Sequence, residues 1–183
     1  MKRLEIIKNN EELKDKLNEY ADFLPFDDFR APESLNGKMV YNMKGKAFGE
    51  AGDGSEFILL EDGSIALGGS EGEVGRIAEN FDDFFSLLVN FPCFWDFLSY
   101  EYFMPENTEK TKLKFKEEMN DDPYCLCDEY MPLFIEKLGI SVDNDVIGNT
   151  AQKMFDAVTR EPKYGYSYDG EYYDEILTHV TFW

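Results

Sequence analysis

The stretch that decides the fold is FGEAGDGSEFILLEDGSIALGGSEGEVGRIAENFDDFFSLLVNF, residues 48–91. The apolar run 57–61 and the returning segment 64–67 flank Asp62-Gly63, a dipeptide typical of two-residue hairpin turns. Residues 74–78 can add another short strand after a glycine-rich loop. The stretch therefore predicts an antiparallel hairpin with a further strand beside it.

A helix is predicted directly after these strands. Asn80 is placed to cap it, and Asp82 and Asp83 fall in the first turn, where the helix dipole favours carboxylates. The side chains that share one helical face are Phe81, Phe84, Phe85 and Leu88. A hairpin and this apolar face already form a small two-layer core.

Elements on either side of this stretch complete an α+β pattern. Asn10 is expected to cap a helix that runs to about Leu24 and is stopped by Pro25, followed over 26–49 by loop with one or two short strands. The aromatic run 91–104 is expected in the core. Mixed charges over 105–122 indicate a solvated connection.

The last third of the chain predicts two helices and a hairpin. Asp122-Pro123 should start a helix that Pro132 kinks or divides before Gly139, and a second helix spans about 150–159. Asp169-Gly170 marks a C-terminal hairpin turn. We expect residues 1–183 to form one α+β domain, with a central mixed or antiparallel sheet packed against several helices.

The charge limits the class of partner. The net charge is −20 and the pI is about 4.3. Such a field repels nucleic-acid phosphates and anionic lipid surfaces, and it attracts a basic protein. Solubility alone can also account for the acidity, and both explanations stay open.

Cysteine usage and the N-terminal residues predict a cytoplasmic protein. Cys93, Cys125 and Cys127 suit neither a disulfide framework nor a zinc site. No window approaches the apolar length of a membrane span, and residues 1–13 hold no apolar signal region.

The motifs that could carry catalysis are weak. The glycine-rich run 67–76 lacks the Lys or Ser/Thr of a phosphate loop and carries Glu71 and Glu73. The acids near the hairpin lack calcium-loop spacing, and His179 lies in a strand-like run without a nucleophile elbow. We therefore expect no enzyme activity, catalytic residue, metal or cofactor.

The residues expected to bind a partner lie in two loops and one hairpin. Charge and expected exposure select the acids that bracket the central hairpin: Asp53, Glu56, Glu71 and Glu73. Alternation places Tyr164, Tyr166 and Tyr168 on one face of the C-terminal hairpin, either at the edge of the core or as an aromatic contact surface flanked by acids. Tyr166 and Tyr168 complete the candidate set.

The central stretch resembles the SUKH superfamily, which includes fungal cell-wall-assembly regulators and bacterial toxin-immunity proteins. The resemblance rests on Gly52–Leu60, Gly63, Ser70-Glu71-Gly72 and 76–88, about 45 residues, with Leu24-Pro25 as a weaker echo. Glu56 replaces the last glycine of the family's "GDGSG"-like turn.

The resemblance implies an α+β fold without catalytic residues and a cytoplasmic antidote that binds a secreted toxin, often a basic nuclease. The alternatives are a regulatory or scaffold interaction domain, a small-ligand-binding protein or a small-molecule or metal-dependent enzyme, and an acidic mimic of nucleic acid. The sequence does not name the toxin or the oligomeric state.

Overall fold

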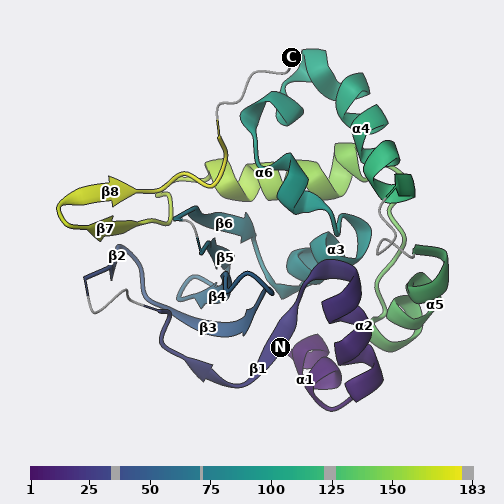
Figure 1. Ribbon diagram of the computed structural model, residues 1–183, viewed down its shortest axis with the longest axis horizontal. Coiled ribbons are helices and arrows are strands. Elements are labelled where there is room, and N and C mark those ends of the chain that lie inside the picture. Colours follow the sequence, from purple (N-terminus) through teal and green to yellow (C-terminus); the bar gives the residue numbers. More distant parts are fainter. Residues whose placement is uncertain (34–37, 71, 122–126, 179–183) are drawn as a thin grey trace.

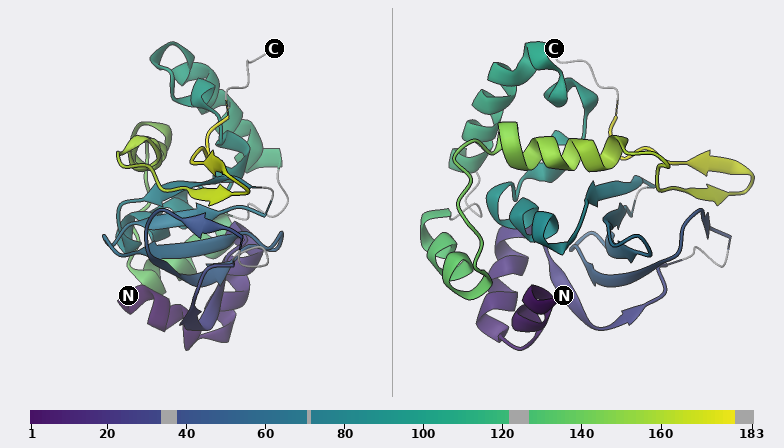
Figure 2. Two further views of the ribbon diagram at one scale, coloured as in Figure 1. Left: turned by 90° about the vertical axis from the view of Figure 1, so that its left-hand side faces the viewer. Right: turned by 180° about the vertical axis from the view of Figure 1, so that it is seen from behind.

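The computed structural model describes residues 1–33, 38–70, 72–121 and 127–178 (Figures 1 and 2). Its α-helices are α1 Lys2–Lys8, α2 Glu11–Ala21, α3 Phe81–Asn90, α4 Thr108–Asp121, α5 Cys127–Leu138 and α6 Gln152–Thr159. Its strands are β1 Leu24–Arg30, β2 Val40–Tyr41, β3 Gly45–Glu50, β4 Glu56–Leu60, β5 Ile65–Gly68, β6 Val74–Ala78, β7 Tyr166–Tyr168 and β8 Glu171–Tyr173. Short 3₁₀ turns η2 Phe94–Phe97, η3 Tyr100–Phe103 and η4 Pro105–Asn107, and a π-helical turn η5 Ile147–Ala151, connect them.

The central stretch folds as its sequence predicts. Strands β4 and β5 pair antiparallel with Phe57 opposite Leu67, and Gly63 adopts a φ of 89° in the turn. Strand β6 covers the predicted range and pairs with β5. Asn80 caps α3, because its side-chain oxygen accepts hydrogen bonds from the backbone N–H groups of Asp82 at 2.8 Å and Asp83 at 2.9 Å.

Five antiparallel strands form the main sheet in the order β1-β3-β4-β5-β6. Helices pack on one face of this sheet (Figure 1). Phe23 lies at the centre of that core, with its ring centroid 5.4 Å from that of Phe57 and 5.5 Å from that of Phe84. The predicted α+β class with an antiparallel sheet packed against helices is confirmed.

A second, smaller core covers the opposite face of the main sheet. Ala47, Ile58 and Ala66 point to this side and are fully buried. Tyr164 and Tyr166 cover them from the small sheet β2-β7-β8. Successive side chains of β4 point to opposite faces of the sheet, and both sets are buried because a core covers each face.

The helix capped by Asn10, which is α2 in the structure, was predicted to end at about Leu24, and this was wrong. Helix α2 ends at Ala21, because Asp22 adopts the left-handed conformation with φ 49° and accepts a hydrogen bond from the Gly52 N–H at 2.8 Å. Leu24 and Pro25 then pair with β3 in β1. Pro25 is tolerated because β1 is an edge strand.

The expected solvated connection after residue 105 was also wrong, because most of it forms α4. Lys114 donates to Glu118 at 2.8 Å across one helical turn, a pair of half-buried side chains that supports the helix. Phe115 packs against Phe91, with ring centroids 5.5 Å apart, and Thr111 is buried. The short helix α1 was not predicted either.

The remaining elements agree in part with the sequence. Helix α5 continues through Pro132, and Gly139 follows it with φ 62°, whereas the expected cap at 122–123 lies outside the described residues. Helix α6 and the hairpin β7–β8 form as predicted, with Asp169 and Gly170 at positive φ in the turn. His179 and Cys125 also lie outside the described part of the chain.

Candidate protein-binding surface

The loops between β3 and β4 and between β5 and β6 lie at the same end of the sheet, because consecutive antiparallel turns alternate between the two ends. Asp53 connects them. Its carboxylate accepts hydrogen bonds from the hydroxyls of Ser55 at 2.9 Å and Ser70 at 3.1 Å, and Ser70 N–H donates to Ser55 Oγ. Asp53 is exposed, as expected, and it also holds the two loops together.

Glu56 departs from the exposure on which its selection rested. Its side chain is 5% exposed and lies in β4, not in a loop. The carboxylate accepts hydrogen bonds from Arg30 Nη2 at 2.9 Å and from the Glu33 N–H at 2.7 Å. These contacts attach the chain beyond β1 to the sheet and leave Glu56 little surface for a partner.

Glu73 and Tyr166 come together across the second loop. The Tyr166 hydroxyl donates to the Gly72 carbonyl at 3.2 Å. Burial, followed by the nearby charge of Glu73, raises the pKa of Tyr166. Glu73 is half-buried, and Glu71 lies outside the described residues.

Tyr164, Tyr166 and Tyr168 share one face of β7 and its approach, as alternation predicts, but this face points inward. Tyr41 stacks on Tyr164 with centroids 5.5 Å apart and planes within 1°, and it meets Tyr166 edge-on. Burial raises the pKa of Tyr41 to about 12 and also raises that of Tyr164. Tyr166 is buried and Tyr168 half-buried, so these rings mainly attach the hairpin to the sheet.

The outward face of the small sheet presents the exposed apolar groups. Cross-strand pairing places Val40 opposite Ser167 and Ser167 opposite Tyr172, in one row. Val40 is 66% exposed and Tyr172 52%, while the Tyr172 hydroxyl accepts a hydrogen bond from the Asn42 amide at 2.8 Å. Sequence reasoning omitted Tyr172 from the candidate set, although the same alternation assigns it to the face opposite Tyr166.

Carboxylates lie close in sequence to the residues of this outward face. We call residues 164–175 the arm; it projects beyond the rest of the fold (Figures 1 and 2). Its acids are Asp169, Glu171, Asp174 and Glu175. Tyr173, 37% exposed, stacks on Tyr166 and donates to Glu171 Oε2 at 2.9 Å, a bond that raises the pKa of Tyr173. The arm therefore combines held aromatic rings with negative charge.

Arg76 fixes the segment that leads into the arm. This guanidinium is 2% exposed and donates to the carbonyls of Arg160 and Pro162, to Ser64 Oγ and to Asp62. Burial alone would raise the pKa of Asp62, but hydrogen bonds from Ser64 and the charges of Arg76 and Arg160 outweigh it and lower the pKa to about 2. The base of the arm thus carries an ionic network in which two guanidinium groups share the Asp62 carboxylate.

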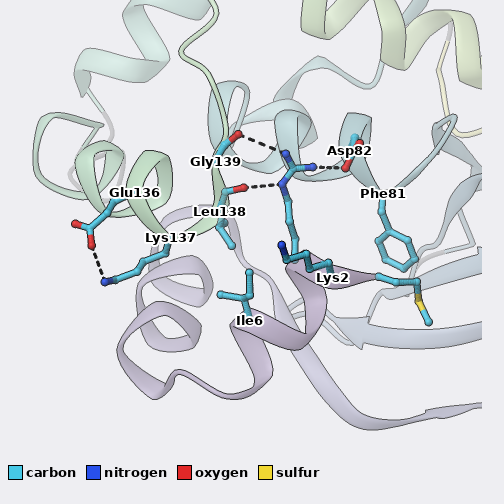
Figure 3. A pocket seen from close by; sticks show the side chains of 10 residues that line it. Lys2, Ile6, Phe81, Asp82, Glu136, Lys137, Leu138 and Gly139 are labelled. Atoms are coloured by element: carbon cyan, nitrogen blue, oxygen red, sulfur yellow. Dashed lines mark hydrogen bonds and ion pairs between the residues drawn. The ribbon is translucent and has the colours of Figure 1, made fainter.

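Two cavities of about 480 Å³ lie away from the arm. The first is lined by α1, the start of α3 and the end of α5, and Figure 3 shows side chains that line it. Arg3 bridges these elements through hydrogen bonds to the carbonyls of Leu138 and Gly139 and an ion pair with Asp82. Arg3 is therefore engaged in holding three helices together. The second cavity is more apolar, with Met119, Met131 and Ile135 among its lining residues.

The described residues contain neither a cluster of three or more metal-ligating side chains nor a helix long and apolar enough to cross a membrane. No protein-family model, curated protein or solved structure matches the chain.

Proposed function

We propose that this protein is an acidic protein-binding domain that neutralises a basic protein toxin, as an immunity protein of the SUKH type in the cytoplasm. The observation that carries the proposal is the arm, where exposed Tyr172 and Tyr173 stand among carboxylates on a projecting sheet. Tyrosine is enriched in the cores of protein interfaces, because it offers a large contact area at a small entropic cost. A net charge of −20 adds steering toward a basic surface.

None of the residues that resemble the SUKH superfamily lies on the arm: many are buried in the core, and others, such as Asp53 and Ser70, are exposed in the two loops. Phe57 of β4 and Phe84 of α3 pack with ring centroids 5.2 Å apart and are fully buried. These two positions build the scaffold, and the arm, which the resemblance does not include, provides surface that can differ between relatives. This division suits a family of antidotes with different toxins.

A regulatory interaction domain is the alternative that uses the same surfaces. It differs in affinity, because a transient regulatory contact is weak, whereas an antidote must occupy its toxin at low concentration. A pull-down from the native cell, with the purified protein as bait at low and at high salt, tests the proposal.

Recovery of one basic protein at low salt, with less recovered at high salt, supports neutralisation by charge-complementary binding. The captured protein should then lose its toxicity when it is expressed together with this chain. Recovery of no protein, of many unrelated proteins, or of one partner whose toxicity persists would contradict the immunity role.

A further inference from the structure

The edges of the two sheets differ in how they are covered. In the main sheet, edge strand β1 contains Pro25, and Lys8 Nζ donates to its Asp27 carbonyl at 2.8 Å. At the other edge, β6 lies against the chain at Ile176, so closely that a Cβ on Gly75 would come within 2.8 Å of Ile176 Cγ2. The small sheet is different, because within the described residues its edge strands β2 and β8 each pair with β7 alone, and of these two strands β8 carries the acidic sequence.

The backbone of Tyr172 points to this open edge. In a two-residue hairpin, the residues that flank the turn exchange both hydrogen bonds, and here these are Tyr168 and Glu171. The next pair, Ser167 and Tyr172, therefore directs its N–H and C=O groups away from each other. The backbone N–H and C=O groups of Ser167 face β2, and the backbone N–H and C=O groups of Tyr172 face away from the sheet.

The charge of the edge decides which strand can join it. Native edge strands are often protected by proline or lysine, and β8 has the sequence Glu171-Tyr172-Tyr173, followed by Asp174 and Glu175. If β8 of a second copy of this chain paired with this edge, the carboxylates of the two copies would lie beside each other. Like charges across a strand pair are destabilising. A segment rich in lysine or arginine would face opposite charges instead.

We propose that the open edge of β8 is the docking site for an extended, basic segment of the protein partner. The segment adds as a further strand to the β2-β7-β8 sheet and takes its hydrogen bonds from the Tyr172 backbone. Its cations lie beside Glu171 and Glu175, and its apolar side chains contact the exposed ring of Tyr172. This inference rests on the proposed function and specifies where and how the basic partner binds.

A labelled peptide of about ten residues in which lysine alternates with valine is the probe, since this pattern favours an extended strand. Its binding to the full chain is followed by fluorescence anisotropy at low salt. A peptide of the same sequence with alternate backbone nitrogens methylated keeps the charge but cannot add to a sheet edge. We expect the methylated peptide to bind at least about tenfold more weakly, because association depends on main-chain hydrogen bonds.

Two double variants separate the arm from the general field of the protein. Glu171→Lys with Glu175→Lys reverses the charge of the edge, and Asp15→Lys with Glu117→Lys makes the same change in net charge on exposed positions of α2 and α4. The arm variant should bind the peptide at least about tenfold more weakly, and the control variant less than about twofold more weakly. Equal losses in the two variants, or equal binding of the methylated peptide, would overturn the inference.

Amide hydrogen exchange of the unsubstituted protein gives a second readout that does not depend on the folding of a variant. The peptide should slow exchange at the Tyr172 N–H and leave β1 unchanged. Protection spread over many acidic segments, or protection of Tyr172 by self-association without peptide, would also overturn the inference.

The failure of this inference can be distinguished from the failure of the proposed function. If a basic partner is captured and neutralised but binds the arm variant as tightly as the unsubstituted protein, the proposed function stands and the β8 site is excluded.

Discussion

Arg76 and Asp62 form an ion pair, with Nη2 and Oδ2 3.2 Å apart, that connects strand β6 to the turn between β4 and β5. The same guanidinium donates to the carbonyls of Arg160 and Pro162, which precede the arm. One buried cation therefore ties the sheet, its turn and the base of the arm together.

Replacing this cation should weaken the whole fold. Arg76→Met keeps most of the aliphatic stem but removes the donor to the Pro162 carbonyl and one of the two cations beside Asp62, which keeps its contacts with Arg160 and Ser64. We expect a loss of about 2–4 kcal/mol in the free energy of unfolding, measured by urea denaturation, because unpaired buried groups are costly. Arg76→Lys keeps the charge but not the planar fork, and should lose an intermediate amount. A loss within about 0.5 kcal/mol for Arg76→Met, as for a typical surface change, would contradict this role.

The stability of the network should depend on acid pH. The folded-state pKa of Asp62 is about 2, below the ordinary value of 3.8, so its contribution is present above pH 3.8 and is lost as the pH falls toward 2. Asp62→Asn removes this titration. The difference in unfolding free energy between the unsubstituted protein and Asp62→Asn should therefore shrink from pH 5 to pH about 2. A difference that stays constant over this window would show that Asp62 is not ionically stabilised.

The hydroxyl of Tyr164 offers a test of the second core. Among the described residues it is buried without a hydrogen-bond partner, whereas the buried Tyr20 hydroxyl donates to the Val89 carbonyl at 3.0 Å. Tyr164→Phe should leave stability unchanged or raise it by up to about 1 kcal/mol, since only an unsatisfied polar group is removed. Tyr20→Phe is the matched control and should cost about 1 kcal/mol. Equal costs at the two positions in thermal unfolding would contradict this assignment.

The cap of α3 gives a local prediction. Asn80→Ala removes the acceptor for the N–H groups of Asp82 and Asp83, and should cost about 1 kcal/mol. Asn80→Ser can still accept one of these bonds and should cost less. Urea denaturation of both variants checks the order, and an Ala variant at least as stable as the Ser variant would argue against the cap.

The central stretch could be predicted because its signals are local. Asp62-Gly63 dictates a turn, and Asn80 with the following acids dictates a helix start, whatever surrounds them. The α4 segment could not be recognised, because its helix depends on the burial of Phe115 and Thr111 against distant aromatic residues. The end of α2 depends on a contact between Asp22 and Gly52 that sequence spacing does not reveal.

The candidate site was predicted in its composition but not in its orientation. Alternation grouped the arm tyrosines correctly, yet it could not tell which face meets the main sheet, because β7 pairs with the distant strand β2. Charge and expected exposure selected Glu56, whose burial depends on Arg30 in a segment that had been expected to be loop with one or two short strands. Local patterns thus identified the groups, and long-range packing decided which of them face solvent.

The central claim is that this chain binds a basic protein through its acidic arm. The most direct measurement is a calorimetric titration of the basic protein captured by the pull-down against three forms of the chain: unsubstituted, Glu171→Lys with Glu175→Lys, and the control Asp15→Lys with Glu117→Lys. We predict binding that weakens with added salt, and a loss of at least about tenfold confined to the arm variant. Affinity that is independent of salt and equal in all three forms would contradict the account.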